Sequence, residues 1–227
     1  MLTIVDAATE VFAQTGFAAA QMVDVARMAG VSVGTLYNYV EGKSALLLLC
    51  AERPFTDITQ GRELPVPTPD RVELIARLDE TLVNHVCVVA LDRALRTPLQ
   101  RTGREVQLAE IVGELFDLIS ATRAAADAME QSARDAPDLG ELFYRRVRVR
   151  LLEQLVRYCR RLRKLESPPP HITPEIAARF ILETVTWWAR HRHRDPAPPN
   201  IDDATARTVA LELVVATMIH QSSPTDP

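Results

Sequence analysis

The sequence predicts an all-α protein, in which a small N-terminal helical unit precedes a larger helical region. Apolar residues recur at helical spacing along most of the 227-residue chain. Only 8 residues are glycine, fewer than the tight turns of a sheet-rich fold normally use. Short β-branched runs that alternate in period two between turn residues are missing from the sequence. These three observations favour helices joined by few connections.

The N-terminal unit is expected to hold four helices. Apolar spacing places them at residues 2–15, 21–29, 33–40 and 43 to about 60. Gly16 and Gly30 follow the first two, where a helix end favours a residue that tolerates positive φ. Ser32 precedes the third helix and can cap it. The proline-rich stretch "LPVPTPD", residues 64–70, then marks a bend before the larger region.

The larger region is also predicted to be helical. Proline and glycine interrupt the apolar spacing and leave helices at about 70–96, 104–134, 138–165, 173–193 and 202–221. We therefore expect two domains, a DNA-binding one at 1–49 and a ligand-binding and dimerisation one at 50–227; the assignment of these functions depends on the motif described below.

Composition excludes several classes of protein. The chain is 47% hydrophobic and 25% charged, with a net charge of −4, as in an ordinary soluble protein. Its three cysteines lie far apart without a C-x-x-C pair, so neither a disulfide framework nor a zinc site is expected. The longest apolar run, residues 45–51, is too short to span a bilayer, and no signal peptide opens the chain. We expect a cytoplasmic protein with no membrane contact, no metal and no cofactor.

Residues 21–40 have the spacing of a helix-turn-helix. Two short helices that cross closely need a small residue at the crossing, and Ala26 provides it. Gly30 suits the turn because it tolerates positive φ. The apolar residues expected to fix the angle between the helices are Val25, Val31 and Leu36. Such a motif presents the start of its second helix to the major groove of DNA.

Residues 2–49 resemble the DNA-binding domain of the tetracycline-repressor (TetR) family of bacterial regulators. The matching residues are Asp6-Ala7-Ala8, Phe12, Gly16-Phe17, Asp24-Val25-Ala26, Ala29-Gly30-Val31-Ser32, Gly34-Thr35-Leu36-Tyr37, Tyr39, Lys43 and Ala45-Leu46. The resemblance implies a transcriptional regulator, a repressor rather than an enzyme, that a small-molecule effector releases from a palindromic operator.

The resemblance also implies a role for each matching residue. Ser32 would cap the recognition helix, and Gln21 would meet a phosphate or a base. Phosphate contacts would come from Thr35, Tyr37 and Lys43, and base contacts from Val33, Gly34 and Asn38. Tyr39 completes this DNA-binding set, although we expect it to pack partly inward.

Some expected phosphate contacts are missing. Val23 and Val33 stand where the family often has cations, Ala20 stands where Ser or Thr usually caps the second helix, and no basic arm precedes the first helix. Each lost phosphate contact lowers the log–log salt slope by about 0.9. The sequence therefore predicts a shallow salt dependence, unless the native chain starts upstream of Met1.

The same stretch supports a competing interpretation. Residues 30–34, "GVSVG", match the G-x-S-x-G pattern of a hydrolase nucleophile elbow, with Ser32 as the nucleophile. That elbow needs a preceding strand, whereas residues 21–29 have helical spacing. Two more hypotheses compete with a regulator, namely an all-α enzyme with a C-terminal cavity and a DNA-binding scaffold without an effector.

The effector pocket and the homodimer interface are expected in the larger region. Dimerisation through about 173–193 and 202–221 follows from the resemblance and from their apolar faces. Tentative pocket residues, chosen as polar and apolar side chains on neighbouring helices, are Asn84, His85, Asp92, Phe116, Ile119, Tyr144, Val147, Leu151, Glu183 and Trp187.

Two charged stretches can be explained without a binding site. Residues 144–166 carry nine cations, which indicate either a solvated helix that balances acidic segments or a second anion-binding surface. His191 and His193 lack a third metal ligand nearby, so structural or surface histidines are expected.

Overall fold

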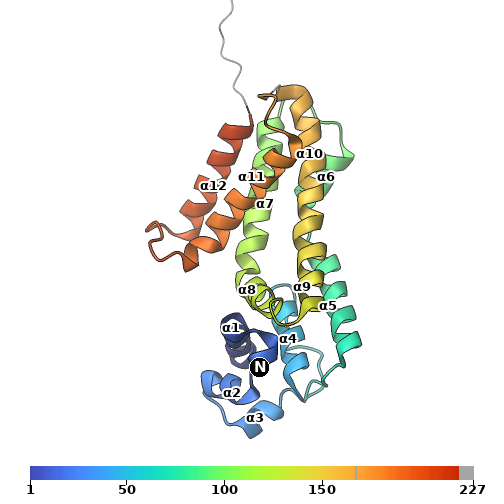
Figure 1. Cartoon of the computed structure of the whole chain (residues 1–227), viewed down its shortest axis with the longest axis vertical. Coiled ribbons are helices and arrows are strands. Elements are labelled where there is room, and N and C mark those ends of the chain that lie inside the picture. The colour runs from blue at the N-terminus through green and yellow to red at the C-terminus, as the bar shows by residue number, and fades with distance from the viewer. Residues whose placement is uncertain (167, 220–227) are drawn as a thin grey trace, which may run out of the picture. The chain divides into compact units, whose positions relative to one another are not determined.

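A computed structural model of the chain describes residues 1–166 and 168–219. Within these residues the regular structure is helical, apart from one isolated parallel bridge between Val40 and Val66 (Figure 1). The all-α prediction is thus confirmed. None of the described helices is long and apolar enough to cross a bilayer.

The chain forms two compact units. The first contains residues 1–86 and 121–149, and the second contains residues 87–120 and those from 150 onward. The predicted boundary after residue 49 falls within a helix (Lys43–Glu52), and the segment before it shares its unit with later helices.

The first unit builds the helix-turn-helix on a helical support. Its elements are α1 (Leu2–Ala19), α2 (Met22–Ala29), α3 (Val33–Tyr37), α4 (Lys43–Glu52), α5 (Arg71–His85), α8 (Arg123–Ser132), α9 (Pro137–Phe143) and the π-helix η1 (Tyr144–Val149). Helix α1 packs against α2, α4 and α8. The fully buried Phe12, Leu46 and Leu49 belong to this core. Burial of these side chains stabilises the orientation of α2 and α3.

The second unit consists of longer helices. Its elements are α6 (Val89–Arg96), α7 (Arg104–Ala121, up to residue 120), α10 (Arg150–Glu166), α11 (Pro174–Ala189), the 3₁₀ helix η2 (His191–Arg194) and α12 (Asp203–Met218). Helix α11 packs against both α10 and α12. Leu108, Leu155, Tyr158 and Ile181 are fully buried in this unit.

Several helices are shorter than predicted. Helix α3 ends at Tyr37 and not at residue 40, and α4 ends at Glu52 and not near residue 60. Pro54 ends the ladder of α4, because it has no N–H for the carbonyl of residue 50.

Three predicted helices are divided, and the one predicted at 138–165 forms α9, η1 and α10. The helix predicted at 70–96 breaks between α5 and α6, where the β-branched Val86, Val88 and Val89 lower the helix propensity. The helix predicted at 104–134 breaks at Thr122 (φ −95°, ψ 3°). These two breaks, and the change from η1 to α10 after Val149, lie at or next to the boundaries between the two units.

Other predicted helix ends agree within one or two residues, but α1 continues past the predicted end at residue 15 to Ala19, and α11 ends at Ala189 and not at residue 193. Gly16 (φ 79°) kinks α1, and Gly30 (φ 68°) ends α2 in the left-handed conformation. Asp70, Thr173 and Asp202 cap α5, α11 and α12 by accepting a backbone N–H three residues on. Residues 220 and 221, the predicted end of the last helix, lie outside the described residues.

Candidate nucleic-acid interface

The turn between α2 and α3 is built as the sequence predicts. The N–H of Gly30 donates to the carbonyls of Ala26 and Arg27, and the N–H of Val31 donates to that of Ala26 at 3.0 Å. A Cβ on Gly30 would meet no atom within 4 Å, so the left-handed backbone and not crowding requires glycine here. Ala26 lies at the crossing and is buried.

The angle between the two helices is held by buried apolar side chains. Val25 and Leu36 are 1% and 0% exposed, whereas Val31 is half-buried. This fixed pair of helices leaves the start of α3 at the surface.

Ser32 is a helix cap. Its Oγ accepts the N–H of Thr35 at 3.0 Å and lies 2.8 Å from the Thr35 hydroxyl. The residues before Ser32 form helix α2 and a turn, so no strand leads into a nucleophile elbow. This geometry argues against the hydrolase interpretation, because an elbow requires a strand-to-helix turn.

The predicted base-contacting residues all lie at the surface. Val33, Gly34 and Asn38 are exposed, as are Gln21 and Tyr37, while Thr35 and Tyr39 are half-buried. Thr35 already shares its hydroxyl with Ser32. The structure therefore brings the predicted set together around α3.

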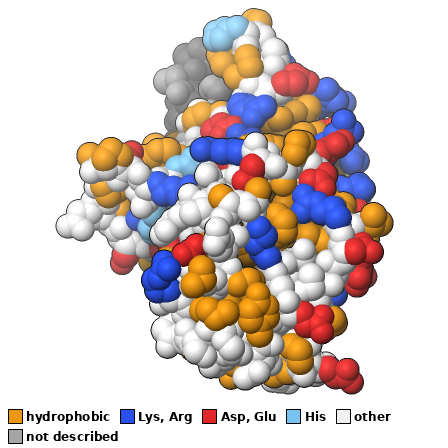
Figure 2. Space-filling model, turned by 60° about the horizontal axis from the view of Figure 1, so that its bottom comes forward, with side chains coloured by type: hydrophobic (Ala, Val, Ile, Leu, Met, Phe, Trp, Pro, Cys, Tyr) orange, Lys and Arg blue, Asp and Glu red, His pale blue; other side chains and the backbone are white. Residues whose placement is uncertain are grey.

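This surface carries little positive charge. Val23 and Val33 are 44% and 37% exposed, in the places where cations were expected from the resemblance. The nearby Arg27 pairs with Asp24 at 2.9 Å. The end of the first unit that carries α2 and α3 shows mainly hydrophobic and uncharged side chains (Figure 2).

The ammonium of Lys43 already makes contacts within the protein. Its Nζ donates to the carbonyl oxygens of Ala18 (3.0 Å) and Ala20 (3.2 Å) and lies 4.8 Å from the ring centroid of Phe17. Burial lowers the pKa of this ammonium, and Asp135 partly offsets that by raising it. An ammonium has three N–H donors, so one is left for a phosphate.

Phe17 connects Lys43 to the support helices of the first unit. The guanidinium of Arg71 lies 5.3 Å from the Phe17 ring centroid, and its Nε donates to Asp138 at 2.7 Å. This link between α1, α5 and α9 was not predicted, because it joins residues far apart in the sequence.

The ten tentative effector residues are divided between the units. Asn84, His85, Tyr144 and Val147 lie in the first unit; Asp92, Phe116, Ile119, Leu151, Glu183 and Trp187 lie in the second. Asn84 and His85 line an open polar hollow beside α4 and α5. Glu183 and Trp187 line an open groove between α11 and α12. A common pocket formed by all ten stays a prediction.

The second unit contains a cavity that the sequence did not indicate. It measures about 320 Å³ and lies among α10, the following proline-rich turn, α11 and the end of α12. Its lining is mostly apolar and includes Leu162, Ile172, Phe180 and Met218. From the sequence alone, the prolines of this turn indicate only a break between two helices and not a cavity.

Two buried polar atoms of the second unit have no hydrogen-bond partner among the described residues. They are the hydroxyl oxygen of Tyr158 on α10 and Oε1 of Gln107 on α7. Burial raises the pKa of the Tyr158 hydroxyl, chiefly by desolvation. A buried polar atom without a partner costs about 1–3 kcal/mol.

The cationic run at residues 144–166 is largely paired. Arg146 contacts Asp79 (2.6 Å), Arg160 contacts Glu175 (2.8 Å), and Arg161 donates to backbone carbonyls. These contacts favour the interpretation as a solvated, charge-balanced helix. Among the described residues no group of three His, Cys, Asp or Glu side chains could hold a metal, and His193 lies 3.2 Å from Asp203.

Known proteins resemble this chain in sequence and in fold. Residues 4–50 match the sequence model of the family described as bacterial regulatory proteins, tetR family. A fatty acid metabolism regulator protein of Bacillus subtilis (strain 168) is 25% identical over 117 residues, 51% of this chain and 59% of that relative. The chain thus matches less than two thirds of that relative's length.

Two solved structures share the fold along most of the chain. The TetR family transcriptional regulator PfmR from Thermus thermophilus has a TM-score of 0.54 at 18% identity, with 93% of this chain and 96% of that one covered. The transcriptional regulator FadR from Bacillus subtilis, in complex with stearoyl-CoA, has a TM-score of 0.50 at 18% identity, with 96% and 99% covered. At this identity the likeness establishes the fold.

Proposed function

We propose that this chain, which belongs to the TetR family of bacterial regulatory proteins, is a transcriptional repressor that binds operator DNA through α2 and α3. The observation that carries the proposal is the capped helix α3, which follows a left-handed glycine turn and presents Val33, Gly34 and Asn38 at the surface. A regulator of this kind acts in the cytoplasm, where its DNA lies.

Each exposed side chain around α3 suits one kind of DNA contact. Asn38 can bond adenine with both ends of its amide, Val33 can touch a thymine methyl, and Gly34 allows close approach of the backbone. Tyr37 and the remaining N–H of Lys43 would meet phosphates, which position the protein without reading sequence. Recognition would therefore depend more on base contacts than on charge.

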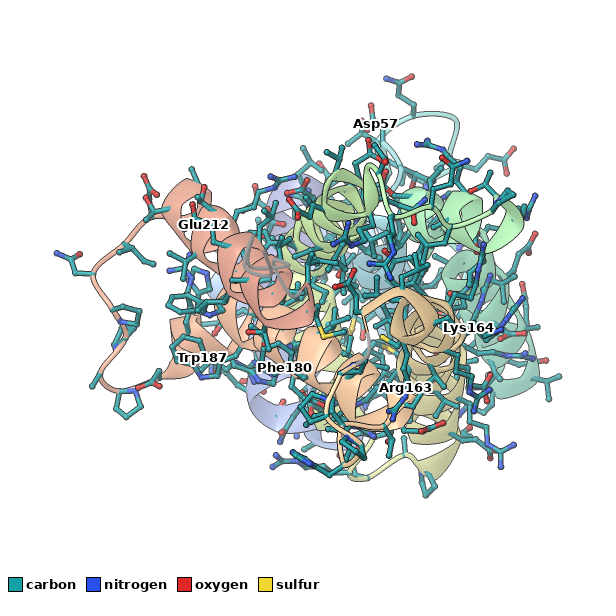
Figure 3. All side chains as sticks on the ribbon, turned by 90° about the horizontal axis from the view of Figure 1, so that it is seen from above. Asp57, Arg163, Lys164, Phe180, Trp187 and Glu212 are labelled. Atoms are coloured by element: carbon teal, nitrogen blue, oxygen red, sulfur yellow. The ribbon has the colours of Figure 1, made fainter. Side chains whose placement is uncertain are left out.

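We propose that the protein acts as a homodimer through α11 and α12. Ile176 and Leu213, 51% and 46% exposed, give these helices apolar surface that a partner subunit would cover. Phe180 and Trp187 lie on the α11–α12 pair (Figure 3), and both line the groove between these helices. A two-fold dimer matches an operator with two half-sites.

We propose an amphiphilic effector with a long apolar part, of the fatty acyl class. The apolar cavity of the second unit supports an apolar ligand, and the few polar side chains of its lining, among them Arg163 and Thr217, support a polar group on it. The name of the fatty acid metabolism regulator and the stearoyl-CoA bound to FadR point to the same class.

The mechanism would be a shift between two conformations. DNA binding favours one of them, and the effector favours the other by its difference in affinity for the two states. A ligand that binds both states equally would shift nothing, however tightly it binds.

Selection of DNA fragments from the source genome with the full-length protein tests this function. We expect recovery of a few fragments that share a palindrome, and their release by a long-chain acyl-CoA but not by coenzyme A alone. Failure to enrich any sequence would contradict sequence-specific binding. Enrichment without release by any acyl-CoA would contradict only the effector class.

A further inference from the structure

A segment outside the helix-turn-helix contacts the chain directly after α3. Residues 64–68, part of the loop between α4 and α5, form the isolated bridge between Val66 and Val40. The N–H of Val66 donates to the carbonyl of Tyr39 at 2.8 Å, and the N–H of Glu41 donates to the carbonyl of Val66 at 2.9 Å. Both bonds join parts of the first compact unit. We call residues 64–68 the 64–68 segment.

The prolines of this segment allow only one register for the contact. Pro65 and Pro67 have no N–H, so within residues 65–68 only Val66 and Thr68 can donate from the backbone. Val66 donates to Tyr39, as described, and the N–H of Thr68 donates to the Glu41 carboxylate at 3.1 Å. Both available donors are therefore directed at residues 39–41.

The contact is also packed. Val40 and Val66 are 0% and 5% exposed, although each lies in a connection between helices. The loop that contains Val66 is anchored before and after this residue. Arg62 forms an ion pair with Glu52 at 2.5 Å, and Asp70 caps α5. Such anchors reduce the freedom of the loop and favour a fixed position of the 64–68 segment.

Gly42 is explained by this contact and not by its backbone. Its φ of −177° is extended, a conformation that any residue adopts. A Cβ at Gly42, however, would lie 2.6 Å from Oγ1 of Thr68, far closer than real contacts allow. Thr68 therefore packs directly on the Cα of the residue that precedes Lys43 and α4.

We propose that the 64–68 segment is a positioning element of the DNA-binding site. It holds residues 39–42, the short connection between α3 and α4, and thereby sets the distance and orientation between Tyr37 and Lys43. It also holds Glu41, the one anion of that connection, through the N–H of Thr68. The operator duplex is its partner only through the residues that it positions. The proposal rests on the proposed function.

The test combines three variants with binding to an operator fragment. Gly42→Ala introduces the clash, Thr68→Ala removes Oγ1 and Cγ2 and leaves only the Cβ, 3.5 Å from the new methyl, and the double variant carries both changes. We expect Gly42→Ala to weaken binding at least tenfold and Thr68→Ala at most threefold. The double variant should recover to within about threefold of the wild type. Circular dichroism and thermal unfolding of each variant report on folding.

The salt dependence separates positioning from a general loss of structure. If Gly42→Ala displaces Lys43 from a phosphate, its log–log salt slope should fall by about 0.9 and return in the double variant. In a Lys43→Ala background, Gly42→Ala should leave the slope unchanged, because that contact is already absent.

Several results would overturn the proposal. A folded Gly42→Ala protein that binds as the wild type does would contradict it, as would a double variant as weak as Gly42→Ala. If Gly42→Ala does not fold, Val66→Ala replaces it, since this change trims a buried side chain without a clash. We expect at least threefold weaker binding, and unchanged binding by folded Val66→Ala would reject the proposal. A wild-type chain that binds no DNA at all would instead reject the proposed function.

Discussion

The cap at Ser32 offers a prediction in which stability and DNA binding separate. Its Oγ accepts the N–H of Thr35 at 3.0 Å, and the helix that it caps has only five residues. Loss of an N-cap costs about 1 kcal/mol. Because Ser32 is exposed, its replacement by Ala removes little packing. For a chain of this size, 1 kcal/mol corresponds to a fall in Tm of about 2–4 °C.

Three substitutions of Ser32 distinguish its role as a helix cap from its role in DNA binding. Ser32→Ala should lower Tm and weaken operator binding about fivefold, the factor that corresponds to 1 kcal/mol. Ser32→Thr should restore both. Ser32→Asp should restore the cap and Tm but bind DNA more weakly than Ser32→Ala, because its carboxylate would lie against the phosphates.

The assays are thermal unfolding and fluorescence anisotropy with the operator fragment. An unchanged Tm in Ser32→Ala would refute the cap, and Ser32→Asp binding as tightly as the wild type would refute its position at the phosphates. Esterase activity should stay at background in all four proteins. Activity that disappears in Ser32→Ala alone would revive the hydrolase interpretation.

Three further predictions concern charge and burial. The wild type should show a shallow salt slope in binding titrations, and Val23→Lys should steepen it by about 0.9, as one added phosphate contact does; an unchanged slope would place Val23 off the DNA. Tyr158→Phe removes a buried hydroxyl without a partner among the described residues, so it should raise the free energy of unfolding by about 1 kcal/mol in urea titrations. Destabilisation would mean that the hydroxyl has a partner. Burial raises the pKa of the Cys50 and Cys159 thiols to about 12. The unfolded chain loses these protons at lower pH than the folded one, so the stability that the two buried thiols contribute is fully present below about pH 9 and is lost as pH rises toward 12. In urea titrations across this range, Cys50→Ala should lose less stability than the wild type.

Local chemistry made the helix-turn-helix predictable. Gly30 and Ser32 act through bonds to residues within six positions of themselves, and the sequence shows these neighbours directly. The end of α3 was less predictable, because residues 39–41 after it bond to Val66 and Thr68. Local spacing carries no information about such partners.

The contacts of Lys43 could not be predicted from the sequence. The sequence indicates a cation beside a helix start, but not that its ammonium donates to carbonyls 23 and 25 residues away. Likewise, the spacing of residues 64–70 indicates a bend and not a bridge to Val40. The predicted effector residues combine polar and apolar side chains from helices that follow one another in the sequence, and the structure divides them between two units.

The central claim is that a pair of capped α3 helices reads an operator with two half-sites. Hydroxyl-radical footprinting of the full-length protein on a recovered genomic fragment tests it most directly. We expect two protected regions related by a dyad, with centres about 10–10.5 base pairs, or a multiple of this, apart. Both protections should disappear with Asn38→Ala and Tyr37→Ala combined. A single protected region, or protection that the double substitution leaves unchanged, would contradict the account.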